Sequence, residues 1–130
     1  MTAKDLFGRK ARDANAEGRR QIAIVEYVRW VAPQCVIFHP ANGGWRTKAE
    51  AARFKAMGVV AGTPDLVLVL PSGRSAWWEI KVSTGRLSPQ QKEFAARLTE
   101  LCHEWAIIRS VEDARGELAR LGIKTKDHNG

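Results

Sequence analysis

The stretch DLVLVLPSGRSAWWEIKV, residues 65–82, decides the fold of this chain. Its first six residues are almost entirely aliphatic, and residues 76–82 return to that character after a short segment containing Pro71 and Gly73. Two such runs joined by proline and glycine predict an antiparallel hairpin. The run at residues 65–70 is too apolar for either of its faces to be exposed, so we expect the hairpin at the centre of a sheet.

The sequence on both sides of the hairpin predicts further helices and strands. Helices are predicted over residues 13–32, 48–57, 89–102 and 111–122, and strands over residues 35–38 and 105–109. Pro33 cannot continue the first helix, while Ser88, followed by Pro89, and Ser110 have the chemistry of helix N-caps. This order predicts one α/β domain in which helices flank a small mixed sheet.

Length and composition agree with one folded domain. The chain has 130 residues, of which 45% are hydrophobic and 27% are charged, as in globular proteins. It contains neither a signal-peptide pattern nor an apolar run approaching the roughly 20 residues of a membrane span. We therefore expect a cytoplasmic protein. The 21 Lys and Arg residues outnumber the 14 Asp and Glu residues, and the resulting net charge of +7 favours an anionic partner, with nucleic acid first.

The two cysteines, Cys35 and Cys102, are far apart in the sequence and belong to no CxxC pair. A zinc site needs more thiol or imidazole ligands at closer spacing. We expect two buried free thiols.

Three charged residues interrupt the apolar hairpin: Asp65, Glu79 and Lys81. Side chains alternate along a strand, so Glu79 and Lys81 share one face, and Asp65 is a direct or diagonal neighbour of Glu79. Two carboxylates that close repel each other unless a cation lies between them. Mg²⁺ prefers such oxygen ligands, and Lys81 beside it would orient water or stabilise a phosphoryl group. The alternative is a structural ion-pair network of the same three side chains.

Two polar residues outside the hairpin bear on this choice. At about 100° per residue, Glu17 falls on the apolar side of the first predicted helix, whereas Glu26 projects roughly opposite. Glu17 either faces a metal or is an ordinary acidic residue of a first helical turn. Gln91 lies in the first turn of the helix after the Lys81 strand, where it is either solvated or reaches back over the strand end.

These residues together resemble the VRR-NUC family of the PD-(D/E)XK nuclease superfamily. The resemblance rests on Gly62-Thr63-Pro64-Asp65, on Glu79-Ile80-Lys81 and on Ser88-Pro89-Gln90-Gln91, and it extends from about Glu17 to Leu121. It implies a restriction-endonuclease-like sandwich at residues 13–123. The residues before it, 1–12, are polar, basic and contain a glycine, which predicts a flexible basic arm, and residues 124–130 are expected to form a polar tail.

The resemblance also implies site residues and a reaction. Asp65, Glu79 and the Ile80 backbone carbonyl would bind Mg²⁺ or Mn²⁺, Lys81 would be the catalytic lysine, and Gln91 the glutamine that follows the active strand. Glu17 matches the family's helix acid best, and Glu26 is the fallback. The implied activity is hydrolysis of DNA phosphodiesters. Small stand-alone members, often phage-encoded, are homodimers that act on branched DNA such as Holliday junctions.

Several further residues are candidates for contacting DNA phosphates. They are Asn42, Arg46, Lys48, Arg53, Arg74 and Arg86. Each alone has the chemistry of a solvated surface residue, and the prediction rests on their sum. The competing hypothesis for the whole chain is a non-catalytic, basic nucleic-acid-binding module. Loss of DNA cleavage on changing any one of Asp65, Glu79 or Lys81 would separate the nuclease from that module.

Overall fold

The computed structural model describes residues 3–41 and 47–127, and within these ranges the side chains from Asn15 onward. The elements, in chain order, are α1 (Ala3–Val31), β1 (Val36–Phe38), α2 (Lys48–Ala56), β2 (Leu66–Val69), a 3₁₀ turn at Pro71–Gly73, β3 (Ser75–Ile80), α3 (Pro89–Glu100), β4 (Glu104–Ile108) and α4 (Val111–Arg120). The four strands form one sheet in the order β1-β2-β3-β4. Only β3 and β4 pair in parallel, so the sheet is mixed as predicted.

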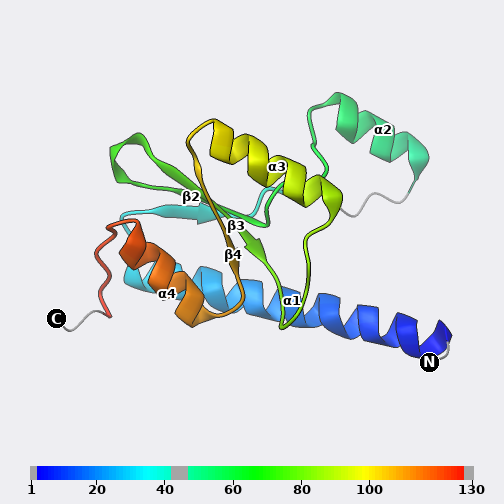
Figure 1. Ribbon diagram of the computed structural model, residues 1–130, viewed down its shortest axis with the longest axis horizontal. Coiled ribbons are helices and arrows are strands. Elements are labelled where there is room, and N and C mark those ends of the chain that lie inside the picture. Colours follow the sequence, from blue (N-terminus) through cyan, green and yellow to red (C-terminus); the bar gives the residue numbers. More distant parts are fainter. Residues whose placement is uncertain (1–2, 42–46, 128–130) are drawn as a thin grey trace.

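The helices enclose this sheet from both sides. α1 and α4 lie together against one face, and α3 covers the other (Figure 1). The predicted α/β sandwich is therefore confirmed. α2 stands apart from these layers, and none of its side chains is buried.

The hairpin of β2 and β3 has the predicted antiparallel arrangement. Leu66 pairs with Trp78, so the next pair toward the open end of the hairpin is Asp65 with Glu79. Trp78 and Ile80 point into the core formed with α1 and α4. Trp77 points the other way, and its ring centroid lies 5.8 Å from that of Phe94 on α3. Because side chains alternate, Glu79 shares the face of Trp77, beneath α3.

α1 packs through the predicted apolar stripe, and Ile24, Val28 and Val31 are fully buried. It ends at Val31, shortly before Pro33. The predicted start at residue 13 was wrong, since the helix begins at Ala3. Residues 3–12 are mostly Ala, Lys, Arg and Leu, which favour helix, and this local preference outweighs the polar, glycine-containing character on which the loose arm was predicted.

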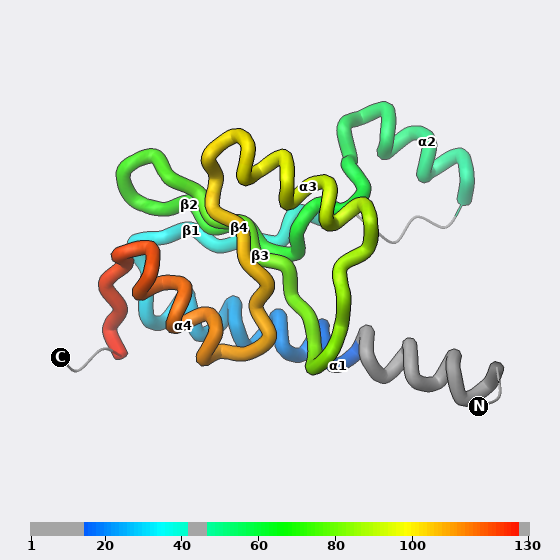
Figure 2. The backbone as a smooth tube through the Cα atoms, in the orientation of Figure 1, coloured from blue at the N-terminus to red at the C-terminus, as the bar shows by residue number. Residues whose placement is uncertain are grey.

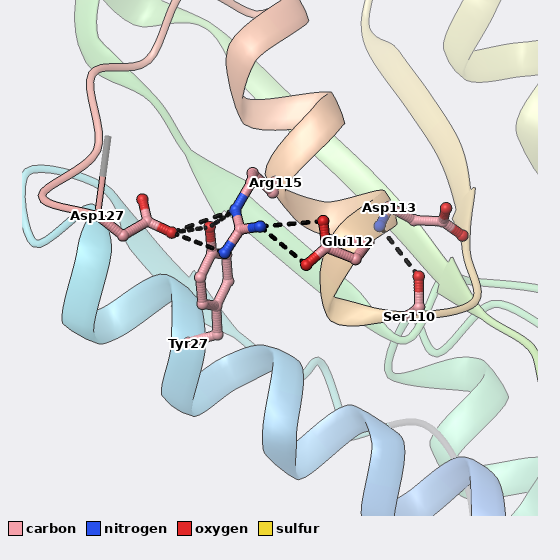
Figure 3. Close-up of polar contacts among 6 residues, drawn as sticks. All are labelled: Tyr27, Ser110, Glu112, Asp113, Arg115 and Asp127. Carbon is pink, nitrogen blue, oxygen red and sulfur yellow. Dashed lines mark hydrogen bonds and ion pairs between the residues drawn. The ribbon is translucent and has the colours of Figure 1, made fainter. Parts of the chain in front are cut away.

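The C-terminal segment is bound to the helices by a polar cluster (Figure 3). The Tyr27 hydroxyl on α1 donates to Asp127 at 2.6 Å, and the Arg115 guanidinium on α4 lies 3.2 Å from the same carboxylate oxygen. The Lys126 N–H donates to the Val31 carbonyl at 2.8 Å. We call Tyr27, Arg115 and Asp127 the C-terminal latch.

The two cysteines differ in their surroundings. Cys35 is buried, as predicted, but Cys102 is exposed, so the prediction for Cys102 was wrong. Cys102 follows the end of α3 with φ at 64°, in the turn that leads into β4, and this turn faces solvent. Across the described ranges, no helix has the length and apolar character required to cross a bilayer.

Candidate active site

Two carboxylates meet at the open end of the β2–β3 hairpin. Asp65 is half-buried at the start of β2, where its Oδ2 accepts a hydrogen bond of 2.8 Å from the Ile80 N–H. Glu79 is only 3% exposed and is the one charged residue in the described core. The prediction that these side chains are neighbours is borne out by the strand register.

Gln91 connects the start of α3 to Glu79. Its Nε2 donates to Glu79 Oε1 at 2.9 Å, while its own Oε1 accepts from the Ser88 N–H at 2.8 Å. The Ser88 hydroxyl in turn accepts from the Gln91 N–H, which completes a capping box. Gln91 therefore reaches back over the strand, as one of its two interpretations required, and α3 holds it there.

The buried position of Glu79 changes its acidity. Burial disfavours the charged form most. The neighbouring Asp65 adds to this because it can accept a hydrogen bond from protonated Glu79 and repels charged Glu79, so that the pKa of Glu79 rises from 4.5 to about 9. Lys81 acts in the opposite direction, and the charge of Glu17 adds to the increase. A cation at this position would reverse the effect, because it stabilises the carboxylate.

One oxygen of Glu79 has no donor. Oε2 is buried without a hydrogen-bond partner in the structure, in a carboxyl group that neighbours Asp65. A proton or a metal ion between the two carboxylates would satisfy it, so this pair of oxygen ligands fits a divalent cation such as Mg²⁺. In the described part of the chain no three His, Cys, Asp or Glu side chains gather as a metal site. Hence Asp65 and Glu79, with backbone oxygen and water, would have to hold such an ion.

Lys81 follows directly after β3 and is half-buried. Its N–H donates to the Ile108 carbonyl of β4 at 3.2 Å, which extends the parallel pairing by one residue. Strand alternation directs its side chain to the face of Glu79. The attractive interaction of Lys81 with Glu79 agrees with this placement.

The two candidate helix acids occupy different surroundings on α1. Glu17 is half-buried, and its charge acts on Glu79. Glu26 is exposed. The structure therefore brings Glu17 toward the carboxylate pair, while its role as a metal ligand stays a prediction.

A cleft of about 230 Å³ opens beside Asp65 and the first turn of α3. Gly62 forms part of its wall with φ at +86°, and a Cβ at this position would lie 2.3 Å from the Gln90 carbonyl oxygen. Only glycine permits this approach of the loop to α3. The loop before β2 and the start of α3 are thereby packed together around the site.

The predicted DNA-contacting residues are spread over the molecule. Lys48 and Arg53 are exposed on α2, and Arg86 is exposed in the loop between β3 and α3. Arg74 lies at the closed end of the hairpin, away from Asp65, and donates to the Leu121 carbonyl at 2.8 Å. Asn42 and Arg46 lie outside the described residues.

Sequence reasoning missed two residues around the site. His39 Nδ1 lies 2.6 Å from the Asp65 carbonyl oxygen, and the Arg109 guanidinium donates to the loop that follows Lys81. His39 follows a predicted strand, but the partner of that strand could not be read from the sequence. For Gln91, by contrast, the sequence carries a local signal. The Ser88-x-x-Gln91 spacing is that of a capping box at the start of a helix.

Comparisons with known proteins agree with this geometry. A family model of the VRR-NUC domain matches residues 18–112. No curated protein matches the chain. A solved structure described as a VRR_NUC domain protein has a TM-score of 0.62 at 22% identity, covering 80% of this chain and 85% of that one. Another, described as a VRR_NUC domain, has a TM-score of 0.54 at 19% identity, covering 80% and 94%. The chain therefore belongs to the VRR-NUC family, a nuclease domain of the PD-(D/E)XK type.

Proposed function

We propose that this protein is a metal-dependent DNA endonuclease that uses Mg²⁺ or Mn²⁺. The observation that carries the proposal is the Asp65–Glu79 pair, in which Glu79 is buried with one oxygen that lacks a donor. A buried carboxylate with an acidic neighbour is costly, and a divalent cation offsets that cost. Lys81, two residues beyond Glu79 on the same face, supplies a further positive charge at the site.

The residues of the site divide the work as follows. Asp65, Glu79 and the Ile80 carbonyl would hold the cation, with Glu17 as the candidate for a further ligand. A divalent cation at this position supplies Lewis-acid charge toward the scissile phosphodiester. Gln91 fixes the orientation of Glu79 through its Nε2 hydrogen bond. The Lys81 ammonium orients the attacking water and stabilises the negative charge that develops on the phosphoryl oxygens.

The substrate follows from charge and family membership. A net charge of +7 favours a polyanion, and a nuclease domain acts on nucleic acid, so we propose DNA. Branched DNA, a Holliday junction or flap, cut by a cytoplasmic homodimer is the finer proposal, since symmetric cutting of a junction needs two sites. Lys48, Arg53, Arg74 and Arg86 are exposed candidates for phosphate contacts, and Asn42 and Arg46 remain in that proposed set.

The experiment compares the natural protein with Lys81→Ala, and with Lys124→Ala as an exposed-lysine control. Each is incubated with supercoiled plasmid, with a labelled linear duplex and with a labelled four-way junction, in Mg²⁺, Mn²⁺ or chelator. We expect metal-dependent cutting by the natural protein and the control, and a loss of at least about 100-fold in Lys81→Ala, the range of one electrostatic group.

Other outcomes decide between the alternatives. Faster cutting of the junction than of linear duplex supports branched DNA, and equal rates contradict that part. No cutting of any substrate, combined with metal-independent DNA binding, would replace the nuclease by a non-catalytic nucleic-acid-binding module. In that case Asp65, Glu79 and Lys81 form a structural network.

A further inference from the structure

Arg109 is the first residue after β4, and both its backbone N–H and its backbone carbonyl are hydrogen-bonded. Its N–H donates to Asp113 Oδ2 at 2.9 Å, in the first turn of α4. Its carbonyl accepts a short hydrogen bond from the guanidinium of Arg20 on α1. Arg109 is thus anchored between two helices that belong to the packed layer beneath the sheet.

The side chain of Arg109 extends from this anchor to the loop at residues 81–88. One guanidinium nitrogen donates to the Ser83 carbonyl at 2.7 Å and another to the Gly85 carbonyl at 3.0 Å. The same loop dips toward α1 between β3 and α3 (Figure 2). Ser83 has φ at 39°, a conformation that a residue with a Cβ rarely adopts, so the loop is held in a shape it would not favour alone.

Gly85 connects Lys81 to the loop that Arg109 binds. The Gly85 N–H donates to the Val82 carbonyl at 2.8 Å, which closes a tight turn directly after Lys81. A Cβ placed on Gly85 would lie 3.4 Å from Lys81 Cδ and 3.6 Å from Lys81 Cβ. Gly85 therefore lies next to the aliphatic stem of Lys81, on the side toward which its missing Cβ would point.

We propose that Arg109 is a positioning residue for Lys81. Its guanidinium fixes the turn at residues 82–85, and the Gly85 backbone then confines the Lys81 stem so that the ammonium stays on the Asp65–Glu79 side. This inference rests on the proposed nuclease function. An arginine suits the task because its planar fork reaches two carbonyls at once, whereas a lysine offers a single charged point.

The kinetic test uses Arg109→Met, which keeps the aliphatic part of the side chain and removes the guanidinium donors. Arg97→Met, at an exposed position of α3, is the matched control. We expect kcat for DNA cleavage to fall about 10- to 100-fold, the cost of a misplaced catalytic group. KM for DNA should stay within about twofold, because no substrate contact is lost. Arg109→Lys should recover part of kcat, and the control should match the natural protein.

A second variant reaches the same turn without removing a charge. In Gly85→Ala, the new Cβ would lie 3.1 Å from the Val82 carbonyl oxygen and against Lys81 Cδ. We expect the same pattern as in Arg109→Met, a lower kcat with KM unchanged. A raised KM with unchanged kcat in Arg109→Met would instead make Arg109 a DNA-phosphate contact and overturn the inference.

Hydrogen exchange provides a measurement that does not depend on catalysis. In Arg109→Met the Gly85 amide should exchange faster, while the amides of β3 and β4 keep their protection and Tm stays close to that of the control. Unchanged exchange at Gly85 refutes the inference even if the enzyme cuts DNA. If the natural protein cuts no DNA while Gly85 exchange rises in the variant, the proposed nuclease function fails and Arg109 is a structural loop anchor only.

Discussion

Glu79 is the residue at which stability and the proposed function oppose each other. Its carboxylate is buried beside Asp65, receives one hydrogen bond from Gln91, and leaves one oxygen without a donor. The folded protein therefore favours the protonated form, and the pKa of Glu79 rises to about 9. The unfolded chain, in which this carboxyl titrates near 4.5, releases the proton much earlier. A residue kept for packing alone would not carry this penalty.

Glu79→Gln is expected to stabilise the metal-free protein. Between pH 4.5 and about 9 the folded state of the natural protein holds a proton that the unfolded state has lost, so its stability falls as the pH rises through that window. A glutamine removes this dependence, and its amide can still accept from Gln91. In chelator, Tm of Glu79→Gln should exceed that of the natural protein by a margin that grows toward pH 9 and vanishes below pH 4.5.

Mg²⁺ should affect the Tm of the natural protein and that of Glu79→Gln differently. It should raise Tm of the natural protein at pH 8, because the ion stabilises the buried carboxylate, and leave Tm of Glu79→Gln nearly unchanged. Glu93→Gln, at an exposed position of α3, serves as the control, and its Tm should respond to Mg²⁺ as that of the natural protein does. Equal pH dependence of Tm in Glu79→Gln and the natural protein would contradict the buried, protonated state of Glu79.

At the scale of the element, the first turn of α3 has two separable roles. Ser88 caps the helix through its hydroxyl, and Gln91 both completes the cap and binds Glu79. The close approach of Gly62 to Gln90 adds a packing constraint from the loop before β2. A single helix terminus thus sets both the local stability of α3 and the orientation of a site carboxylate.

Ser88→Ala and Gln91→Ala should separate these two roles. Both remove part of the cap, and each should cost about 1 kcal/mol of unfolding free energy, the usual value for an N-cap. Only Gln91→Ala also releases Glu79 from its amide donor, so kcat should fall about tenfold or more in this variant and stay nearly unchanged in Ser88→Ala. Chemical denaturation and plasmid cleavage measure the two effects. Equal loss of kcat in both variants would mean that the cap, and not the bond to Glu79, supports activity.

The elements themselves were largely predictable because their ends carry local chemistry. Pro33, Ser88 and Ser110 mark helix boundaries in the sequence, and the structure ends or starts helices beside each of them. The start of α1 was misplaced because residues 3–12 combine helix-favouring side chains with a glycine and many charges. The exposure of Cys102 was also missed, since the direction of the turn after α3 depends on where β4 joins the sheet.

At the scale of the whole molecule, the C-terminal latch joins α1, α4 and the end of the described chain (Figure 3). The Tyr27 hydroxyl, followed by Thr125 and Arg115, lowers the pKa of Asp127 below its ordinary value of 3.8. Burial and the bond to Asp127 raise the pKa of Tyr27. At neutral pH, Asp127 of the latch is therefore charged and Tyr27 is protonated, which is the state that their hydrogen bond requires.

Asp127→Asn is expected to lower Tm by a few degrees at neutral pH. The stabilising effect of the charged carboxylate is complete above pH 3.8 and is lost as the pH falls through the lowered pKa of the folded state. The difference in Tm between the variant and the natural protein should accordingly shrink below pH 3.8. The kcat of the folded variant should not change, because the latch groups bind one another and not the site. A difference in Tm that persists undiminished in acid would contradict this electrostatic account.

Local information determined which residues form strands and helices, and it identified the acidic pair. Alternation along a strand is a backbone property, so the nearness of Asp65 and Glu79 followed from the hairpin alone. The choice of Gln91 over its neighbour Gln90 rested on resemblance, and its bond to Glu79 is seen only in the structure.

Only the tertiary structure decided how deeply Glu79 is buried and what holds the residues around it. The burial of Glu79 depends on the packing of α3 over the sheet. The proposed positioning of Lys81 depends on Arg109, which lies 28 residues later in the sequence and binds the Ser83 and Gly85 carbonyls. Periodicity and composition describe one element at a time. They do not contain the distances between elements, and these distances set the pKa of Glu79 and the position of Lys81.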